Sequence, residues 1–287
     1  MARILIAGGT GLLGSTVGPY LAGQRHDVFI HGRRVAGALR ADLSEPDAAR
    51  WLLDDVKPDV VINLVALTDV DACEMQPSEA KRINVDVVRN IADWISGGNG
   101  PYHLIQISTD QVYSGEGPHS EDSANPINEY ARSKLEAEAV ASQVPSTIVR
   151  TNFFGRSRCS GRASLSDWLV QSLSEGKSIS VFEDVLFGPL SMNALAVMIG
   201  MLVDARPSGV LNLGSREGLS KAAFAFALAA TLNLPTKTMS EGLFEGGRFA
   251  AQRPKDMRMN CSKFEAALGV KLPTLLQEIA TMRQEYS

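Results

Sequence analysis

A glycine-rich turn near the start of the chain limits the folds that the chain can adopt. Residues 3–7 read RILIA, an apolar run with strand propensity, and residues 8–14 read GGTGLLG before a helical stretch over residues 15–22. A strand that runs through closely spaced glycines into a helix lets backbone N–H groups approach a pyrophosphate at the helix N-terminus. The spacing Gly8-x-x-Gly11-x-x-Gly14 therefore predicts a dinucleotide site; a tight turn without a ligand is the alternative.

Apolar segments alternate with helical segments through the first half of the chain. Expected strands cover residues 28–31, 60–65, 104–108 and 146–150, and expected helices cover residues 47–56, 79–95 and 129–144. Strands separated by helices of this length need right-handed crossovers, which produce a parallel sheet covered on both faces. The pattern predicts an α/β fold with a doubly wound parallel sheet.

After Arg150 the pattern is less regular, with expected helices over residues 166–175, 192–205, 220–232 and 273–285 and one strand over residues 210–213. Ligands of doubly wound sheets lie beyond the carboxyl ends of the strands, so this half is expected to roof the site. We expect a dinucleotide-binding domain over residues 1–150, with a return segment near residues 185–204. A smaller α/β region over residues 151–287 is expected to bind mainly the substrate.

Tyr130 and Lys134 lie four positions apart in the predicted helix, within NEYARSKLEAE. On a helix they are separated by about 40° of rotation and roughly 6 Å of rise, so both can reach one substrate oxygen. A free tyrosine has a pKa of about 10 and exchanges protons near neutral pH only where a cation favours its phenolate. Lys134 is expected to be that cation; a surface tyrosine beside a solvated lysine is the alternative.

Composition and charge exclude several other classes of protein. The net charge is −4, and no apolar run approaches the roughly 18 to 20 residues that span a membrane. Cys73, Cys159 and Cys261 are far apart, and neither they nor the four histidines show a metal-ligand spacing. Met1 leads directly into the first strand, which argues against a signal peptide. We expect a cytoplasmic globular protein with no metal and with no membrane or nucleic-acid partner.

Five motifs occur in the order found in the extended short-chain dehydrogenase/reductases. They are GGTGLLG, VALTDVDACE at residues 65–74, STDQVYSG at residues 108–115, Tyr130-x-x-x-Lys134, and RTNFFG at residues 150–155. Over nearly its whole length the chain resembles the dTDP-4-dehydrorhamnose reductase family, to which its segments at residues 253–254 and 260–263 are also similar. It departs at residues 183–191, EDVLFGPLS, where that family usually has Asp-Gln-Phe-Gly followed by Pro-Thr. The identity of the sugar is therefore not carried over.

The resemblance implies a Rossmann fold and a role for each matching residue. Thr109 would hydrogen-bond the substrate carbonyl, Tyr130 would pass the proton, and Lys134 would bind the nicotinamide ribose while lowering the tyrosine pKa. The hydride would come from the cofactor. The cofactor is expected to contact Gly8, Thr10, Gly11, Leu12, Leu13, Gly14, Arg33, Arg34, Asp42, Leu43, Val65, Ala66, Leu67, Tyr130 and Lys134. The substrate is expected to contact Thr68, Val70, Asn152, Phe153, Arg156 and Arg253.

Two positions separate related activities. Nucleotide-sugar 4,6-dehydratases have Thr-Asp-Glu where this chain has Thr-Asp-Gln at residues 109–111, and a glutamine cannot act as the carboxylate base. The 4-epimerases usually hold NAD through an acid after the second strand, where this chain has Gly-Arg-Arg at residues 32–34. Two guanidiniums suit a 2′-phosphate, so NADPH is the expected cofactor and NADH the alternative. A solvated basic turn would favour neither.

Loops of the second half carry several cations, which favour an anionic, phosphorylated substrate. They are Arg156, Arg158, Arg162, Arg248, Arg253 and Lys255. Together with the resemblance, these cations imply reduction of a nucleotide-diphospho-4-keto-6-deoxysugar. As a separate expectation, the chain can form a homodimer. Two alternatives stay open: an epimerase with bound NAD, and a non-catalytic, cofactor-binding regulatory subunit such as the methionine adenosyltransferase beta subunit.

Overall fold

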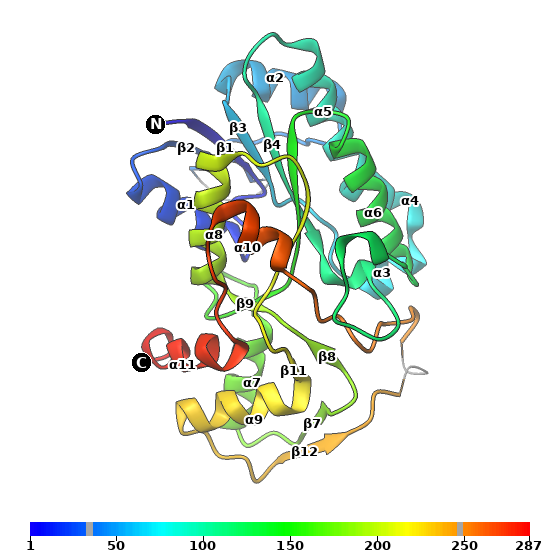
Figure 1. The fold of residues 1–287 in the computed structure, drawn as a ribbon, viewed down its shortest axis with the longest axis vertical. Coiled ribbons are helices and arrows are strands. Elements are labelled where there is room, and N and C mark those ends of the chain that lie inside the picture. Colours follow the sequence, from blue (N-terminus) through cyan, green and yellow to red (C-terminus); the bar gives the residue numbers. More distant parts are fainter. Residues whose placement is uncertain (33–36, 246–248) are drawn as a thin grey trace.

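Six parallel strands form the central sheet of the protein (Figure 1). The computed structural model describes residues 1–32, 37–245 and 249–287. The strand order is β10 (Gly209–Leu213), β5 (Ser146–Thr151), β4 (His103–Thr109), β3 (Val60–Asn63), β1 (Arg3–Ala7) and β2 (Asp27–Ile30). Strands β3, β4 and β5 are buried along their whole length, as expected for central strands of a sheet covered on both faces. The predicted doubly wound α/β fold is confirmed.

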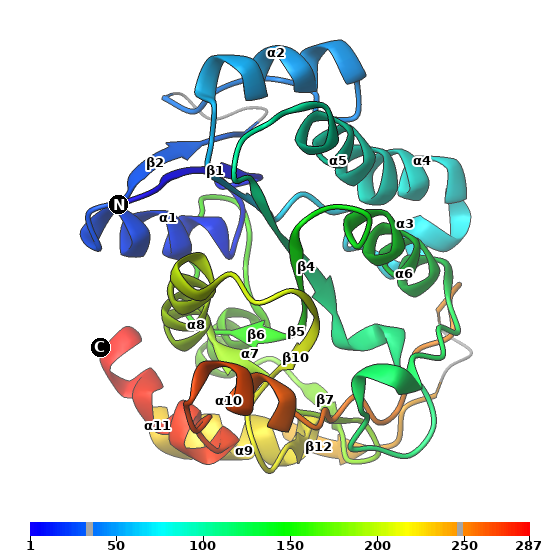
Figure 2. The same cartoon turned by 45° about the horizontal axis from the view of Figure 1, so that its top comes forward.

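Helices cover both faces of this sheet, as Figure 2 shows. Helices α1 (Gly14–Gly23), α8 (Met192–Ala205) and α10 (Ser262–Leu268) pack with the β1 residues Ile4 and Ile6. Helices α2 (Pro46–Val56), α5 (Val87–Gly97) and α6 (Glu129–Ala141) pack with Leu5 and Ala7 on the other face. The alternation along β1 is the two-residue period of a strand, and it divides the core between the two faces.

The second half of the chain forms a smaller body below the carboxyl ends of the strands in Figure 1. Helices α7 (Leu165–Ser174), α9 (Lys221–Leu232) and α11 (Leu275–Glu285) pack around Phe154, Phe187 and Phe224. Three short strand pairs complete it: β6 (Phe153–Phe154) with β9 (Leu190–Ser191), β7 (Ile179–Phe182) with β12 (Met239–Gly242), and β8 (Leu186–Phe187) with β11 (Leu219–Ser220). Between these elements the chain returns to the sheet through α8 and β10.

The expected long helix over residues 79–95 is interrupted. It consists of α4 (Pro77–Lys81), a π-helical turn over Arg82–Asp86, and α5. The turn contains Asn84, whose buried amide accepts from Leu67 N at 2.7 Å and donates to Ser133 Oγ at 2.9 Å. Single π-helical turns within helices are frequent at functional sites. Here the turn joins the segment after β3 to helix α6, which carries Tyr130 and Lys134.

Several short elements were not expected from the sequence. They are α3 (Val70–Met75), α10, and the strands of two to four residues in the second half. Such segments are too short to show a hydrophobic period, and their positions depend on partners that are distant in the chain. Among the described residues, no helix combines the length and the apolar character that crossing a bilayer requires.

A buried ion pair fastens helix α6 to the sheet. Glu138 of α6 and Arg150 of β5 are each 4% exposed, and their charged atoms approach to 2.6 Å. Ser108 of β4 also donates a hydrogen bond to the Glu138 carboxylate, at 2.5 Å. Arg150 also donates to Tyr113 Oη at 2.9 Å. One carboxylate therefore fixes α6 against the two strands whose carboxyl ends flank the site.

We predict that Glu138→Leu lowers the free energy of unfolding by about 3 to 5 kcal/mol, because it leaves the Arg150 guanidinium buried without its counter-charge. Urea denaturation at neutral pH measures this loss. Glu136→Gln is the matched control, since Glu136 lies on the same helix, is 47% exposed, and meets Lys81 and Arg89 only at 3.8 and 3.9 Å. The control is expected to cost less than about 1 kcal/mol. Equal losses in the two variants would contradict the assignment.

Candidate active site

Two adjoining cavities lie at the carboxyl ends of the central strands. The first, which we call the Tyr130 cavity, has a volume of about 410 Å³ and includes Thr109, Tyr130 and Lys134 in its lining. The second, the Asp42 cavity, has a volume of about 440 Å³ and extends past the glycine-rich turn to Asp42 and Ser44. The two cavities share Gly8, Leu64, Ala66 and Arg162. Together they make one groove across the end of the sheet, where doubly wound folds bind their ligands.

Helix α6 begins directly beside the Tyr130 cavity. Asn128 caps it, since its side-chain oxygen accepts from Ala131 N at 2.8 Å, so Tyr130 stands in the first turn. Lys134 lies one turn further and donates from Nζ to the Ile107 carbonyl at 2.7 Å. The two side chains are 6% and 3% exposed. The structure brings both side chains into one cavity with Thr109.

The protonation of this pair differs from the expected one. Burial raises the pKa of Tyr130 above its ordinary value, the Thr109 hydroxyl opposes the rise, and the charge of Asp110 adds to it. Burial also lowers the pKa of Lys134 to about 8, against the opposing charge of Glu138. The expected lowering of the Tyr130 pKa is therefore wrong, because burial raises it and Lys134 is not among the groups that shift it. Tyr130 is a protonated phenol, which can donate a proton.

Asp110 orders the polar wall opposite. It is 1% exposed, and burial raises its pKa to about 6. Its carboxylate accepts from Asn152 Nδ2 at 2.7 Å and from Thr109 Oγ1 at 3.3 Å. It thereby orients two expected site residues. Asn152 and Phe153 both line the Tyr130 cavity.

Gln111 also lines the Tyr130 cavity, and its backbone N–H donates to Thr109 Oγ1 at 3.2 Å. Its buried Oε1 has no hydrogen-bond partner among the described residues. A buried amide oxygen without a partner is costly in a folded protein. Gln111, which stands where the 4,6-dehydratases have glutamate, therefore lies in the same cavity as Tyr130.

The glycine-rich turn forms the shared floor of the groove. A Cβ on Gly14 would lie 2.5 Å from Gly9 Cα, and Gly8 has a φ of +74°, so both positions need glycine. Gly8 and Thr10 line the Asp42 cavity, while Leu12, Leu13 and Gly14 line the Tyr130 cavity. Gly11 lines neither and closes the turn through its N–H to Gly8 O at 3.0 Å. The turn has the shape that lets a diphosphate approach the start of α1.

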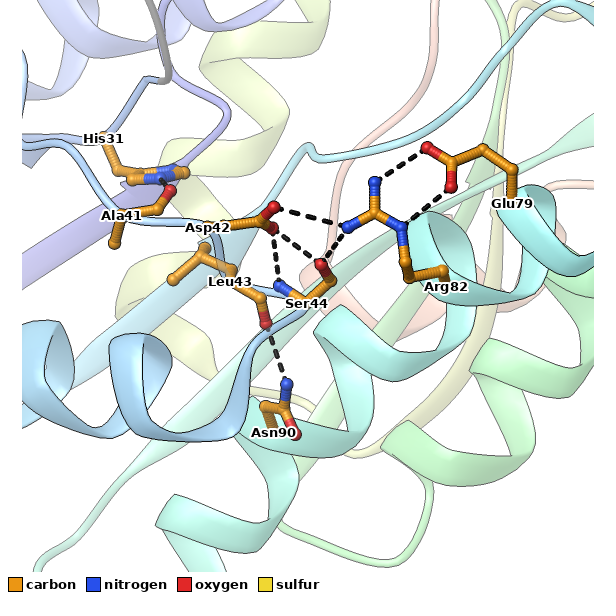
Figure 3. A network of polar contacts seen from close by, with 8 residues as sticks. All are labelled: His31, Ala41, Asp42, Leu43, Ser44, Glu79, Arg82 and Asn90. Carbon is orange, nitrogen blue, oxygen red and sulfur yellow. Dashed lines mark hydrogen bonds and ion pairs between the residues drawn. The ribbon is translucent and has the colours of Figure 1, made fainter.

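A polar network sets the far end of the groove (Figure 3). Asp42 accepts from Ser44 N at 3.1 Å and from Ser44 Oγ at 2.7 Å, and Arg82 donates to its other oxygen at 3.3 Å. Hydrogen bonding from Ser44 lowers the Asp42 pKa. Arg82 is held in turn by Glu79 at 2.7 and 2.8 Å. A fixed carboxylate and the neighbouring Leu43 thus line the cavity beyond the turn.

Other expected residues occupy three kinds of position. Val65, Ala66 and Thr68 line the groove, whereas Leu67 hydrogen-bonds Asn84, and Val70 packs with Tyr130 in a small apolar cluster. Arg253 pairs with Asp71 at 3.0 Å and lines neither cavity. Arg156 lies at a third cavity together with Glu278 and Glu285. This third cavity shares no lining residue with the Tyr130 cavity or the Asp42 cavity. Arg33, Arg34 and Arg248 lie outside the described residues.

Several residues of the groove were not predicted from the sequence. Ser44, Ile83, Val87, Cys159, Ser160 and Gly161 line the Asp42 cavity, and His31 lies behind the turn, where its Nδ1 accepts from Gly8 N at 3.2 Å. Asp110 stood in the quoted Thr-Asp-Gln motif, which was a usable signal. The residues of the loop over 155–164 had no signal except their basic composition.

Comparison with known proteins gives a match to one family over nearly the whole chain. The family described as the RmlD substrate binding domain matches residues 2–287. A probable low-salt glycan biosynthesis reductase of Haloferax volcanii is 28% identical over 98% of this chain and 97% of its own. A dTDP-4-dehydrorhamnose reductase of Sinorhizobium fredii is 30% identical over 76% of this chain and 77% of its own. The methionine adenosyltransferase 2 subunit beta of Mus musculus is 28% identical over 94% of this chain and 84% of its own.

Solved structures share the whole fold. A hypothetical dTDP-4-dehydrorhamnose reductase from Sulfolobus tokodaii superposes with a TM-score of 0.84, at 31% identity, over 96% of this chain and 98% of that one. A dTDP-4-dehydrorhamnose reductase from Bacillus anthracis, solved in complex with NADP, gives a TM-score of 0.89 at 23% identity over 99% of each chain. The similarity therefore covers both the sheet and the smaller body.

The lowered pKa of Lys134 predicts how stability depends on pH. Below about pH 8 the ammonium is charged in the folded and the unfolded chain, so its burial penalty is fully present. As pH rises from about 8 toward 10.5 the folded protein releases this proton first, and the penalty shrinks. Wild type should therefore gain on the order of 2 kcal/mol relative to Lys134→Met between pH 7 and about 9.5.

Urea unfolding of the two proteins at both pH values measures this difference. Lys81→Met is the control, because the Lys81 side chain is 57% exposed and its substitution should show almost no such pH dependence. A stability gap between wild type and Lys134→Met that stays constant with pH would mean that Lys134 keeps an ordinary pKa.

Proposed function

For this chain, which belongs to the family described as the RmlD substrate binding domain, we propose reduction of a nucleotide-diphospho-4-keto-6-deoxysugar with NADPH. The chain is an NAD(P)-dependent oxidoreductase of the extended short-chain dehydrogenase/reductase type. One observation carries the proposal: Thr109, Tyr130 and Lys134 line one cavity, and that cavity adjoins the glycine-rich turn. Two hydroxyls and an ammonium suit a ketone that accepts a hydride and a proton.

In the proposed reaction the substrate carbonyl oxygen lies between the hydroxyls of Thr109 and Tyr130. Tyr130, kept protonated by burial, donates its proton to that oxygen as negative charge develops on it. A bound nicotinamide supplies the hydride to the carbon. The product is a secondary alcohol, and the phenolate of Tyr130 is then neutralised from solvent.

Lys134 has two tasks in this mechanism. Its bond to the Ile107 carbonyl leaves two N–H donors, which can hold the nicotinamide ribose hydroxyls. Its positive charge, supported by Glu138, favours the phenolate that Tyr130 becomes after donating its proton. Asp110 accepts from the Thr109 hydroxyl and from the Asn152 amide. The Thr109 hydroxyl therefore turns its one proton from Asp110 to the carbonyl oxygen when the substrate binds.

For the cofactor we propose NADPH with NADH as the weaker alternative. The support is the Gly-Arg-Arg sequence at residues 32–34, whose guanidiniums suit a 2′-phosphate. Losing one charge-assisted contact of about 1.5 to 3 kcal/mol should cost roughly ten-fold or more in discrimination. Comparing kcat/KM for both cofactors in wild type and Arg33→Ala checks this preference; equal use of both by wild type would contradict it.

Two other functions, a 4,6-dehydratase and a non-catalytic subunit, have specific features for or against them. A 4,6-dehydratase needs a carboxylate base where Gln111 stands in the Tyr130 cavity, and a glutamine amide does not supply one. A non-catalytic regulatory subunit is favoured by the similarity to methionine adenosyltransferase 2 subunit beta. Such a subunit has no need of Thr109, Tyr130 and Lys134 together, so turnover by the isolated chain separates the two functions.

The substrate class is tested with a panel of 4-keto nucleotide sugars and NADPH. We predict loss of nicotinamide absorbance with at least one of them. The corresponding keto sugars without nucleotide diphosphate should react far more slowly, because binding of the remote diphosphate positions the reacting carbon. Equal rates with and without the nucleotide would reduce the assignment to a general carbonyl reductase.

We predict that Tyr130→Phe lowers kcat/KM by about 10² to 10⁴ and leaves the NADPH Kd nearly unchanged, because the hydroxyl acts on the transition state. Tyr113→Phe is the matched control. Tyr113 is fully buried, hydrogen-bonds Asn212 at 2.6 Å and lines neither cavity, so this variant should lose stability and keep its turnover. Unimpaired reduction by Tyr130→Phe would end the mechanism.

A further inference from the structure

The loop over residues 155–164, between β6 and α7, carries three arginines in different surroundings. Arg156 donates to the Glu285 carbonyl at 2.8 Å, and Arg158 donates to Asn193 Oδ1 at 3.3 Å. Both line the third cavity, away from the groove. Arg162 lines the Tyr130 cavity and the Asp42 cavity together. It makes no hydrogen bond or ion pair with another residue in the part of the chain that the structure describes.

The C-terminal end and the tip of this loop are held by different contacts. Its C-terminal end is fixed by a capping box, in which Ser164 N donates to Asp167 Oδ2 at 2.8 Å and Asp167 N donates to Ser164 Oγ at 3.1 Å. At its tip, the Cys159 thiol donates to the Thr10 carbonyl at 3.2 Å. Cys159, Ser160 and Gly161 line the Asp42 cavity. The tip therefore contacts the glycine-rich turn and forms part of the wall of the groove.

We propose that Arg162 binds the diphosphate of the nicotinamide cofactor and that the tip at Cys159 closes over it. This inference rests on the proposed function. A dinucleotide that lies along the groove has its diphosphate between its two nucleosides, and the two cavities meet at Gly8, Leu64, Ala66 and Arg162. The turn offers backbone N–H groups on one side of that point, and Arg162 offers a bidentate guanidinium on the other.

Cofactor binding by Arg162→Gln tests the proposal, with Arg158→Gln as the matched control from the same loop. Quenching or enhancement of NADPH fluorescence gives the Kd. We expect Arg162→Gln to raise the Kd for NADPH at least about ten-fold and Arg158→Gln to leave it unchanged. Equal weakening in both variants would overturn the inference, since it would show only a general field of positive charge.

Fragments identify the group that is bound. 2′-Phospho-ADP-ribose retains the diphosphate, whereas adenosine 2′-phosphate lacks it, so Arg162→Gln should weaken only the first. The diphosphate of a nucleotide-sugar substrate has the same chemistry. A raised KM for the sugar nucleotide with an unchanged Kd for NADPH would move Arg162 to that ligand and overturn the inference. Failure of wild type to bind any nicotinamide nucleotide would instead contradict the proposed function.

The closure at Cys159 has a readout that needs no turnover. Cys73 and Cys261 are buried, and burial raises the pKa of their thiols to about 11 and about 12, so a maleimide should label mainly Cys159. Mass spectrometry follows the labelling. We expect saturating NADPH to slow the labelling of Cys159 in wild type and in Arg158→Gln. Labelling of Cys159 at the same rate with and without NADPH would contradict closure of the tip.

Discussion

The buried carboxylate of Glu138 is the interaction on which the site depends. It meets Arg150 of β5 at 2.6 Å and accepts from Ser108 of β4 at 2.5 Å, and it comes from the helix that carries Tyr130 and Lys134. The same charge opposes the fall in the Lys134 pKa that burial causes. One side chain thus fixes helix α6 on the sheet and supports the ammonium inside the cavity. Breaking a buried pair of this kind is costly, because the remaining charge has no water to solvate it.

Desolvation then sets the chemistry of the cavity. It raises the pKa of Tyr130 and lowers that of Lys134, so both groups are shifted toward their neutral forms. A neutral phenol suits proton donation, and in the proposed reaction the neighbouring ammonium stabilises the phenolate that remains. Asp110, at 1% exposure, adds a carboxyl whose hydrogen bonds orient Thr109 and Asn152. These buried polar groups all lie in the wall of the Tyr130 cavity.

Much of the fold could be predicted because its signals are local. The strand, turn and helix at the N-terminus and the four-residue spacing in α6 depend on backbone geometry over short stretches, and helix α8 has the expected bounds Met192–Ala205. The π-helical turn at Arg82–Asp86 could not be predicted, because it depends on Asn84 bonding Leu67 and Ser133, which are distant in the chain.

Sequence motifs identified Thr109 and Tyr130, which line one cavity. Composition alone could not show which of the basic loop residues lie at that cavity. Arg156 faces the third cavity, Arg253 pairs with Asp71, and Arg162 lines the groove, and only the folded loop separates these three. The predicted direction of the Tyr130 pKa shift was wrong, and the reason is related. Proximity to Lys134 is visible in the sequence, whereas the depth of burial is a property of the packed structure.

The most direct test of the central claim follows the hydride. The enzyme is incubated with a 4-keto nucleotide sugar and NADPH that carries deuterium at the transferable position of the nicotinamide, with each face labelled in a separate sample. We expect NMR to show an alcohol product with deuterium bonded to the former keto carbon in one of the two labelled samples. Recovery of the sugar with no deuterium at that carbon from either face would contradict a reductase.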